Sequence, residues 1–129
     1  AGVLCKEAGA KRALPLPVSV PSHCALMKPA ADKLAVALEE IEFNTPQLPV
    51  INNVDVTAET DPAKIKLALV RQLYSPVRWT ESVQLMSEQG VEKLLEVGPG
   101  KVLTGLTKRI VKSLDAAAVN DVASLEAAK

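Results

Sequence analysis

The single histidine of this 129-residue chain, His23, lies in the run Pro21-Ser22-His23-Cys24. The run follows a strand-like segment, residues 14–20, and precedes a predicted helix. Such a junction fixes the backbone but leaves the imidazole free to face a cleft, where it can act as a general base. The alternative is a hydrogen-bonded histidine that closes a turn, and one histidine without a visible partner does not decide between the two. His23 is therefore the first candidate for a catalytic residue.

The chain holds no clear nucleophile to accompany this base. In hydrolase-like folds a serine nucleophile stands in a Gly-x-Ser-x-Gly turn between a strand and a helix, and these 129 residues lack that pattern. Cys24 adjoins His23, but sequence neighbours rarely point their side chains at each other, so we interpret Cys24 as a structural thiol. The residues themselves thus indicate half of an acyl-transfer site.

Composition favours one globular domain and argues against several function classes. Hydrophobic residues make up 48% of the chain, and 15 basic residues balance 15 acidic ones, so there is no overall basic field for nucleic acid. Cys5 and Cys24 have neither metal-ligand nor CxxC spacing, which predicts reduced thiols in a cytoplasmic protein and no metal site. No signal peptide and no apolar run of about 20 residues is present, so no membrane association is expected.

Alternating strand and helix patterns predict an α/β fold with a mainly parallel sheet. Prolines within the first strand remove backbone donors and favour a position at the sheet edge. The expected elements are a helix end at 3–10, strands at 14–20, 48–54, 91–97 and 116–119, and helices beginning near Pro29, at Asp61-Pro62, at Ser75-Pro76 and at Val102.

Gly98-Pro99-Gly100-Lys101 follows a predicted strand and opens a predicted helix, as a phosphate-binding loop does. A Walker loop would need glycine in place of Leu95 and serine or threonine in place of Val102, and a dinucleotide-binding loop would need glycine in place of Leu103. We therefore interpret the run as a tight turn at a helix N-terminus.

Four segments add a resemblance to this pattern. They are VSVPSHC (18–24), VINNVD (50–55), LVRQLYSPVRW (69–79) and EVGPGKVL (96–103). In this order they resemble the C-terminal part of the malonyl-CoA:acyl carrier protein transacylase family of bacterial type II fatty-acid synthesis. The resemblance extends over nearly the whole chain.

The resemblance implies a fold of two parts. Residues 1–19 would be the end of an inserted ferredoxin-like subdomain, and residues 20–129 would belong to a large α/β-hydrolase-like subdomain. The family's serine elbow, the arginine that grips the malonyl carboxylate and the glutamine of the oxyanion hole lie in a part that these residues do not include. A polypeptide of these 129 residues alone is thus expected to transfer no malonyl, and could serve at most as a noncatalytic fragment or carrier-protein interaction module.

The resemblance also implies the roles of two site residues. His23 matches the family's general base, which takes the serine proton and later activates the phosphopantetheine thiol of the carrier protein. Gln72 matches the position whose main-chain carbonyl, in place of a carboxylate, orients the imidazole. Malonyl-CoA and acyl carrier protein are the implied partners, and no cofactor is implied.

Two basic pairs, Lys11-Arg12 and Lys108-Arg109, are candidates for docking the carrier protein. Acyl carrier proteins are acidic, so a basic patch near the cleft would steer their approach. Lys101 and Lys112 accompany the second pair on the same predicted helix. An ordinary solvated surface explains either pair as well.

Overall fold

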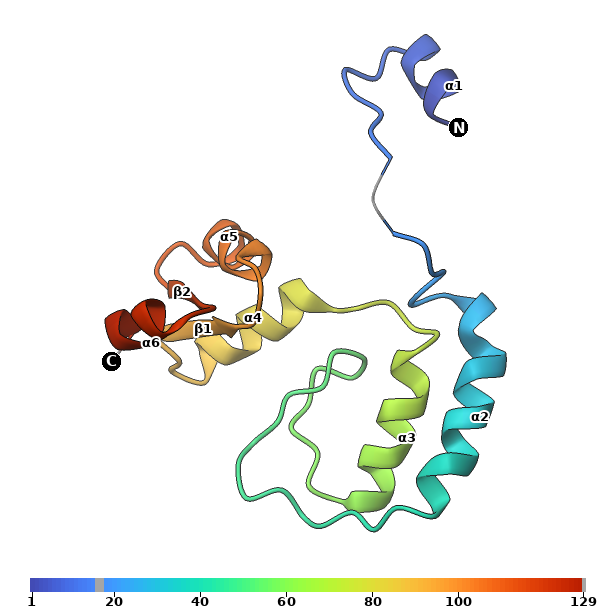
Figure 1. The fold of residues 1–129 in the computed structure, drawn as a ribbon, viewed down its shortest axis with the longest axis vertical. Helices are drawn as coiled ribbons and strands as arrows, with labels where there is room; N and C mark the ends of the chain where they lie inside the picture. The colour runs from blue at the N-terminus through green and yellow to red at the C-terminus, as the bar shows by residue number, and fades with distance from the viewer. Residues whose placement is uncertain (16–17, 129) are drawn as a thin grey trace.

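A computed structural model describes residues 1–15 and 18–128 of the chain. Figure 1 shows three parts: a first helix that lies apart from the others, a helix pair, and a unit in which helices surround two strands. The elements are α1 (Gly2–Glu7), the 3₁₀ helix η1 (Ala25–Met27), α2 (Lys28–Glu39), α3 (Pro62–Gln72), α4 (Trp79–Glu88), β1 (Lys93–Val97), α5 (Val102–Ile110), β2 (Asp115–Val119) and α6 (Val122–Ala128).

Strands β1 and β2 form a parallel pair in which Lys93 stands opposite Asp115 and Val97 opposite Val119. Helix α5 makes the crossover between them, because parallel neighbours need a long connection. α4 packs on α5, and both α5 and α6 contact β2. Val83, Leu114, Ala116 and Val119 are buried in this unit. The predicted α/β class with a parallel sheet is confirmed.

The helix pair α2 and α3 starts where the sequence predicts. Pro29 lies in the first turn of α2, and the Asp61 carboxylate caps α3 by accepting a hydrogen bond from the Ala63 N–H at 2.9 Å. Ala31, Leu38 and Ala68 are buried between the two helices and their surroundings. This pair forms the framework to which the segment around His23 is attached.

Two predicted strands are not strands in the structure. Residues 16–17 of the first lie outside the described residues, and the positions on either side, 14–15 and 18–19, belong to no strand. The segment 48–54 contributes only an isolated antiparallel bridge between Ile51 and Ala58. Here the Asn52 side-chain oxygen accepts hydrogen bonds from the Val54 and Asp55 N–H groups, at 3.2 and 2.7 Å, which folds the backbone into a turn.

One helix boundary differs from expectation, and one helix was not predicted. α4 begins at Trp79 and not at Ser75-Pro76, because the backbone N–H of Arg78 donates outside the helix to the Asn53 carbonyl at 3.0 Å. Helix α6 was not predicted, although Asp121 is a typical N-terminal capping residue. Its carboxylate accepts a hydrogen bond from the Ser124 N–H at 2.7 Å. Gly90 follows the end of α4 with a φ of 85°.

Glu96 of β1 caps the N-terminus of α5. Its carboxylate accepts hydrogen bonds from the Leu103 and Thr104 N–H groups, at 3.2 and 2.7 Å, and from the Thr104 hydroxyl at 2.8 Å. Donors that would bind a phosphate are thus already satisfied within the chain. This arrangement favours the interpretation of residues 98–101 as a turn and not as a phosphate loop.

The same hydrogen bonds lower the pKa of Glu96 from 4.5, the Thr104 N–H being the largest cause. A lowered folded-state pKa stabilises the fold above pH 4.5, and this contribution is lost as the pH falls through the lower value. We therefore expect Glu96→Gln to lower the urea midpoint at pH 7, with a difference from wild type that shrinks below pH 4.5. Exposed Glu88, changed to Gln, is the control and should leave the midpoint unchanged at both pH values. A constant difference across this range would contradict the assignment.

Candidate functional site

His23 lies between the segment that follows α1 and the short helix η1, and it takes an unusual backbone conformation. Its φ is 60°, in the left-handed region that few residues other than glycine adopt. Its backbone N–H donates to the Leu73 carbonyl at 3.0 Å, which ties this residue to the end of α3. A strained position fixed by a tertiary contact is typical of functional sites.

The imidazole makes a second contact with the same helix end. His23 Nδ1 lies 2.9 Å from the main-chain oxygen of Gln72. Because a carbonyl oxygen only accepts, Nδ1 carries the proton, and Nε2 keeps its lone pair. The side chain is exposed, so Nε2 is open to a reacting group. The structure thus brings His23 and the Gln72 carbonyl together, as the resemblance implied.

Helix α3 ends at this point and supplies both acceptors. The last carbonyls of a helix lack partners within the helix, and its C-terminus carries a partial negative charge. Here the carbonyls of Gln72 and Leu73 are bonded by the side chain and the backbone of His23. The helix end therefore holds the imidazole in one orientation.

The positive φ of His23 leads to a stability prediction. Alanine and glycine both remove the imidazole, but only glycine adopts the left-handed region without strain. In a complete protein that contains this chain, His23→Gly should be more stable than His23→Ala by about 1 kcal/mol, measured by urea unfolding. At an ordinary exposed position the alanine variant would be the more stable of the two. A more stable His23→Ala protein would therefore rule out backbone strain at this residue.

Cys24, the neighbour of His23, has a structural contact. The Cys24 thiol donates to the Pro21 carbonyl at 3.2 Å and is half-buried, which agrees with a structural thiol.

Residues 1–15 and 18–128 hold no group of three His, Cys, Asp or Glu side chains that could bind a metal ion. Within the same described residues, no helix combines the length and the apolar character needed to cross a membrane.

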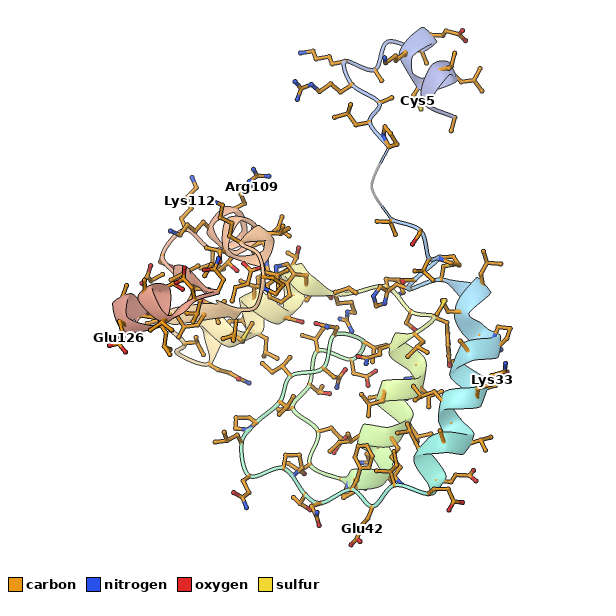
Figure 2. All side chains as sticks on the ribbon, in the orientation of Figure 1. Cys5, Lys33, Glu42, Arg109, Lys112 and Glu126 are labelled. Atoms are coloured by element: carbon orange, nitrogen blue, oxygen red, sulfur yellow. The ribbon has the colours of Figure 1, made fainter. Side chains whose placement is uncertain are left out.

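The structure does not bring the two basic pairs together. Lys11 and Arg12 follow α1, whereas Lys108 and Arg109 lie in the last turn of α5, and Figure 1 shows these helices well apart. All four side chains are exposed. Figure 2 shows Arg109 and Lys112 pointing outward from the α5 region. Lys108 and Arg109 on α5 are thus exposed and can contact an acidic surface.

A hollow beside the sheet was not anticipated from the sequence. Its volume is about 480 Å³, and residues of α4, β1, α5 and the segment 49–53 line it, Trp79 and Glu96 among them. The Trp79 indole N–H is buried and has no hydrogen-bond partner in the part of the chain that the structure describes. His23 and Gln72 do not line this hollow. The only signal in the sequence was that Trp79 is the single tryptophan.

Comparison with known proteins gives a consistent picture. No family model matches the chain. The malonyl CoA-acyl carrier protein transacylase of Salmonella typhimurium is 71% identical over 128 residues, which are 99% of this chain and 41% of that protein. The chain matches the C-terminal portion of malonyl CoA-acyl carrier protein transacylases. It spans about two-fifths of the length of these relatives.

Solved transacylases share the fold. An acyl carrier protein S-malonyltransferase from Vibrio cholerae has 82% identity and a TM-score of 0.89, over 99% of this chain and 42% of its own. A malonyl-transacylase in complex with a type II PKS acyl-carrier protein has 72% identity and a TM-score of 0.90, over 98% of this chain and 41% of its own. The observed arrangement of helices and the parallel pair is that of these transacylases.

Proposed function

We propose that the chain supplies the general base of a malonyl-CoA:acyl carrier protein transacylase. The observation that carries the proposal is the contact between His23 Nδ1 and the Gln72 carbonyl, which leaves Nε2 as an oriented and exposed proton acceptor. The identity of 71% with a transacylase over almost all of the chain supports the same reaction.

In the first half-reaction, Nε2 of His23 takes the proton of a serine hydroxyl supplied by the remaining portion of the enzyme. The serine oxygen attacks the thioester carbonyl of malonyl-CoA, and the carbon–sulfur bond breaks. The departing coenzyme A thiolate takes the proton from the imidazolium, and malonyl remains as a serine ester. The Gln72 carbonyl accepts the hydrogen bond from Nδ1–H and holds the ring in place during these two proton transfers.

In the second half-reaction, Nε2 takes the proton of the phosphopantetheine thiol of acyl carrier protein. The thiolate attacks the malonyl-serine ester, the ester carbon–oxygen bond breaks, and the serine oxygen recovers the proton from the imidazolium. One histidine therefore serves both half-reactions, and no cofactor takes part in either.

We also propose that the chain is divided between two subdomains. Residues 1–19 would end a ferredoxin-like insertion, and residues 20–129 would form part of an α/β-hydrolase-like subdomain. The separation of α1 from the remaining helices supports this division (Figure 1). A cytoplasmic location is supported by Cys5 and Cys24, which are both free thiols.

The carrier protein would dock on Lys108 and Arg109, with Lys11 and Arg12 as the alternative. The outward-pointing side chains of Arg109 on α5 and of Lys112 just after it support the first choice (Figure 2), and a similar transacylase has been solved with a carrier protein bound. Long-range attraction between opposite charges accelerates such encounters and weakens with salt.

Radiolabelled malonyl-CoA and holo acyl carrier protein test the proposed function. A complete protein that contains this chain should form a labelled ester and pass the label to the carrier. The alternative, a carrier-protein interaction module without catalysis, predicts carrier binding with no transferred label. That result would reject the transacylase assignment.

A further inference from the structure

The segment that bears the acceptor for His23 is attached at both ends to one turn. The segment 72–77 extends from the last residue of α3 toward α4 and includes the carbonyls of Gln72 and Leu73. Arg71 precedes this segment and Arg78 follows it. Both arginines contact residues 52–57, which we call the Asn52 turn. The position of the acceptor carbonyls therefore depends on a turn distant in sequence.

Hydrogen bonds within the Asn52 turn fix its shape. The Asn52 side-chain oxygen accepts from the Val54 and Asp55 N–H groups, and its side-chain amide donates to the Thr57 carbonyl at 3.0 Å. The Asn52 backbone N–H donates to the Thr57 carbonyl as well, at 3.1 Å. Val56 takes a left-handed φ of 59° to close the turn. This geometry presents the Asp55 carboxylate on a rigid base.

Each arginine binds this turn in its own way. The Arg71 guanidinium forms an ion pair with the Asp55 carboxylate. Arg78 donates from its backbone to the Asn53 carbonyl at 3.0 Å, and its guanidinium reaches the Val54 and Asp55 carbonyls at 3.5 and 3.4 Å. The Arg78 guanidinium is held in turn by both Glu81 oxygens, each at 2.6 Å. The acceptor segment is thus fixed immediately before Gln72 and again before α4.

We propose that Asp55 and Arg71 are positioning residues for His23, because their ion pair holds the last turn of α3 where the Gln72 carbonyl meets Nδ1. This inference rests on the proposed function. The Asp55 and Arg71 side chains are 37% and 42% exposed, and exposed pairs contribute little to global stability. A hydrogen bond, in contrast, weakens steeply when its geometry is lost. Loss of the pair therefore affects the orientation of His23 more than the fold.

Arg71→Gln, Asp55→Asn and the double variant, each in a complete transacylase that contains this chain, test the proposal. Each single variant should lower kcat for malonyl transfer by about fivefold, the effect of weakening one hydrogen bond, and leave KM for malonyl-CoA unchanged. The double variant should lose no more than either single one, because the two residues act as one pair. Asp55→Asn keeps the side-chain shape and gives the result if Arg71→Gln does not fold.

A spectroscopic measurement separates positioning from general destabilisation. With ¹⁵N-histidine labelling, the His23 Nδ1–H resonance should be visible in the wild type and lost, by faster exchange with water, in the Asp55 and Arg71 variants. Lys64→Gln is the matched control, because Lys64 and Glu59 form an ion pair at the other end of α3, with a separation of 4.0 Å. The control should retain both the resonance and the activity.

The failure of this inference can be told apart from the failure of the proposed function. If His23→Ala abolishes transfer while the Asp55 and Arg71 variants keep wild-type kcat and an unchanged resonance, the positioning role is wrong and the base assignment stands. If His23→Ala transfers malonyl normally, the proposed function itself is wrong. Equal losses in the Lys64 control would also overturn the positioning role.

Discussion

His23→Ala, in a complete transacylase that contains this chain, is expected to lower malonyl transfer by roughly a hundredfold to ten-thousandfold, the range typical of a removed general base. Nε2 is the only imidazole acceptor that the chain offers, and the bond from Nδ1 to the Gln72 carbonyl fixes its tautomer. The substitution removes an exposed side chain, so the folded structure should persist. Initial rates with saturating malonyl-CoA and carrier protein provide the measurement.

Both half-reactions should slow in this variant, because in the proposed mechanism the same nitrogen serves the serine and the phosphopantetheine thiol. Rapid-quench measurement of the labelled serine ester separates the two steps. Cys24→Ala is a suitable control, since its thiol bonds to the Pro21 carbonyl and stands next to His23 in sequence. Near-normal turnover by the purified His23→Ala protein would remove this residue from the mechanism.

Local signals in the sequence sufficed for elements whose ends are set by their own residues. Asp61-Pro62 predicts the start of α3 because a capping carboxylate and a proline act within one turn. The strand predicted at 48–54 was wrong, because the Asn52 side chain bonds the backbone that a strand would have used. The start of α4 depends on a contact between Arg78 and Asn53, 25 residues earlier, which no local pattern contains.

The residues of the candidate site were also predictable only where their own type gave a signal. His23 could be chosen by residue type, because imidazole is the common base near neutral pH. Its partner could not, since a main-chain carbonyl is present at nearly every position and only the resemblance pointed to Gln72. The Asp55 and Arg71 pair was equally hidden, because charged residues 16 apart give no signal until the turn and the helix end are brought together.

Reversal of two charges on α5, Lys108→Glu with Arg109→Glu, is expected to raise KM for acyl carrier protein roughly tenfold while leaving KM for malonyl-CoA almost unchanged. Both side chains are exposed in the last turn of α5, and neither forms an ion pair with any residue that the structure describes. An acidic carrier would meet two positive charges in the wild type and two negative ones in the variant. Steady-state kinetics with each substrate varied in turn give the two constants.

The matching reversal of Lys11 and Arg12 distinguishes the two candidate surfaces. These residues lie near α1, well away from α5 in Figure 1, so a carrier that docks on α5 should be affected much less by this second variant. Salt provides an independent check, because screening weakens an electrostatic encounter. KM for the carrier should rise with ionic strength in the wild type and change less in the α5 variant. If the α5 variant shows an equal rise in KM for both substrates, or no rise in either, the carrier docks elsewhere.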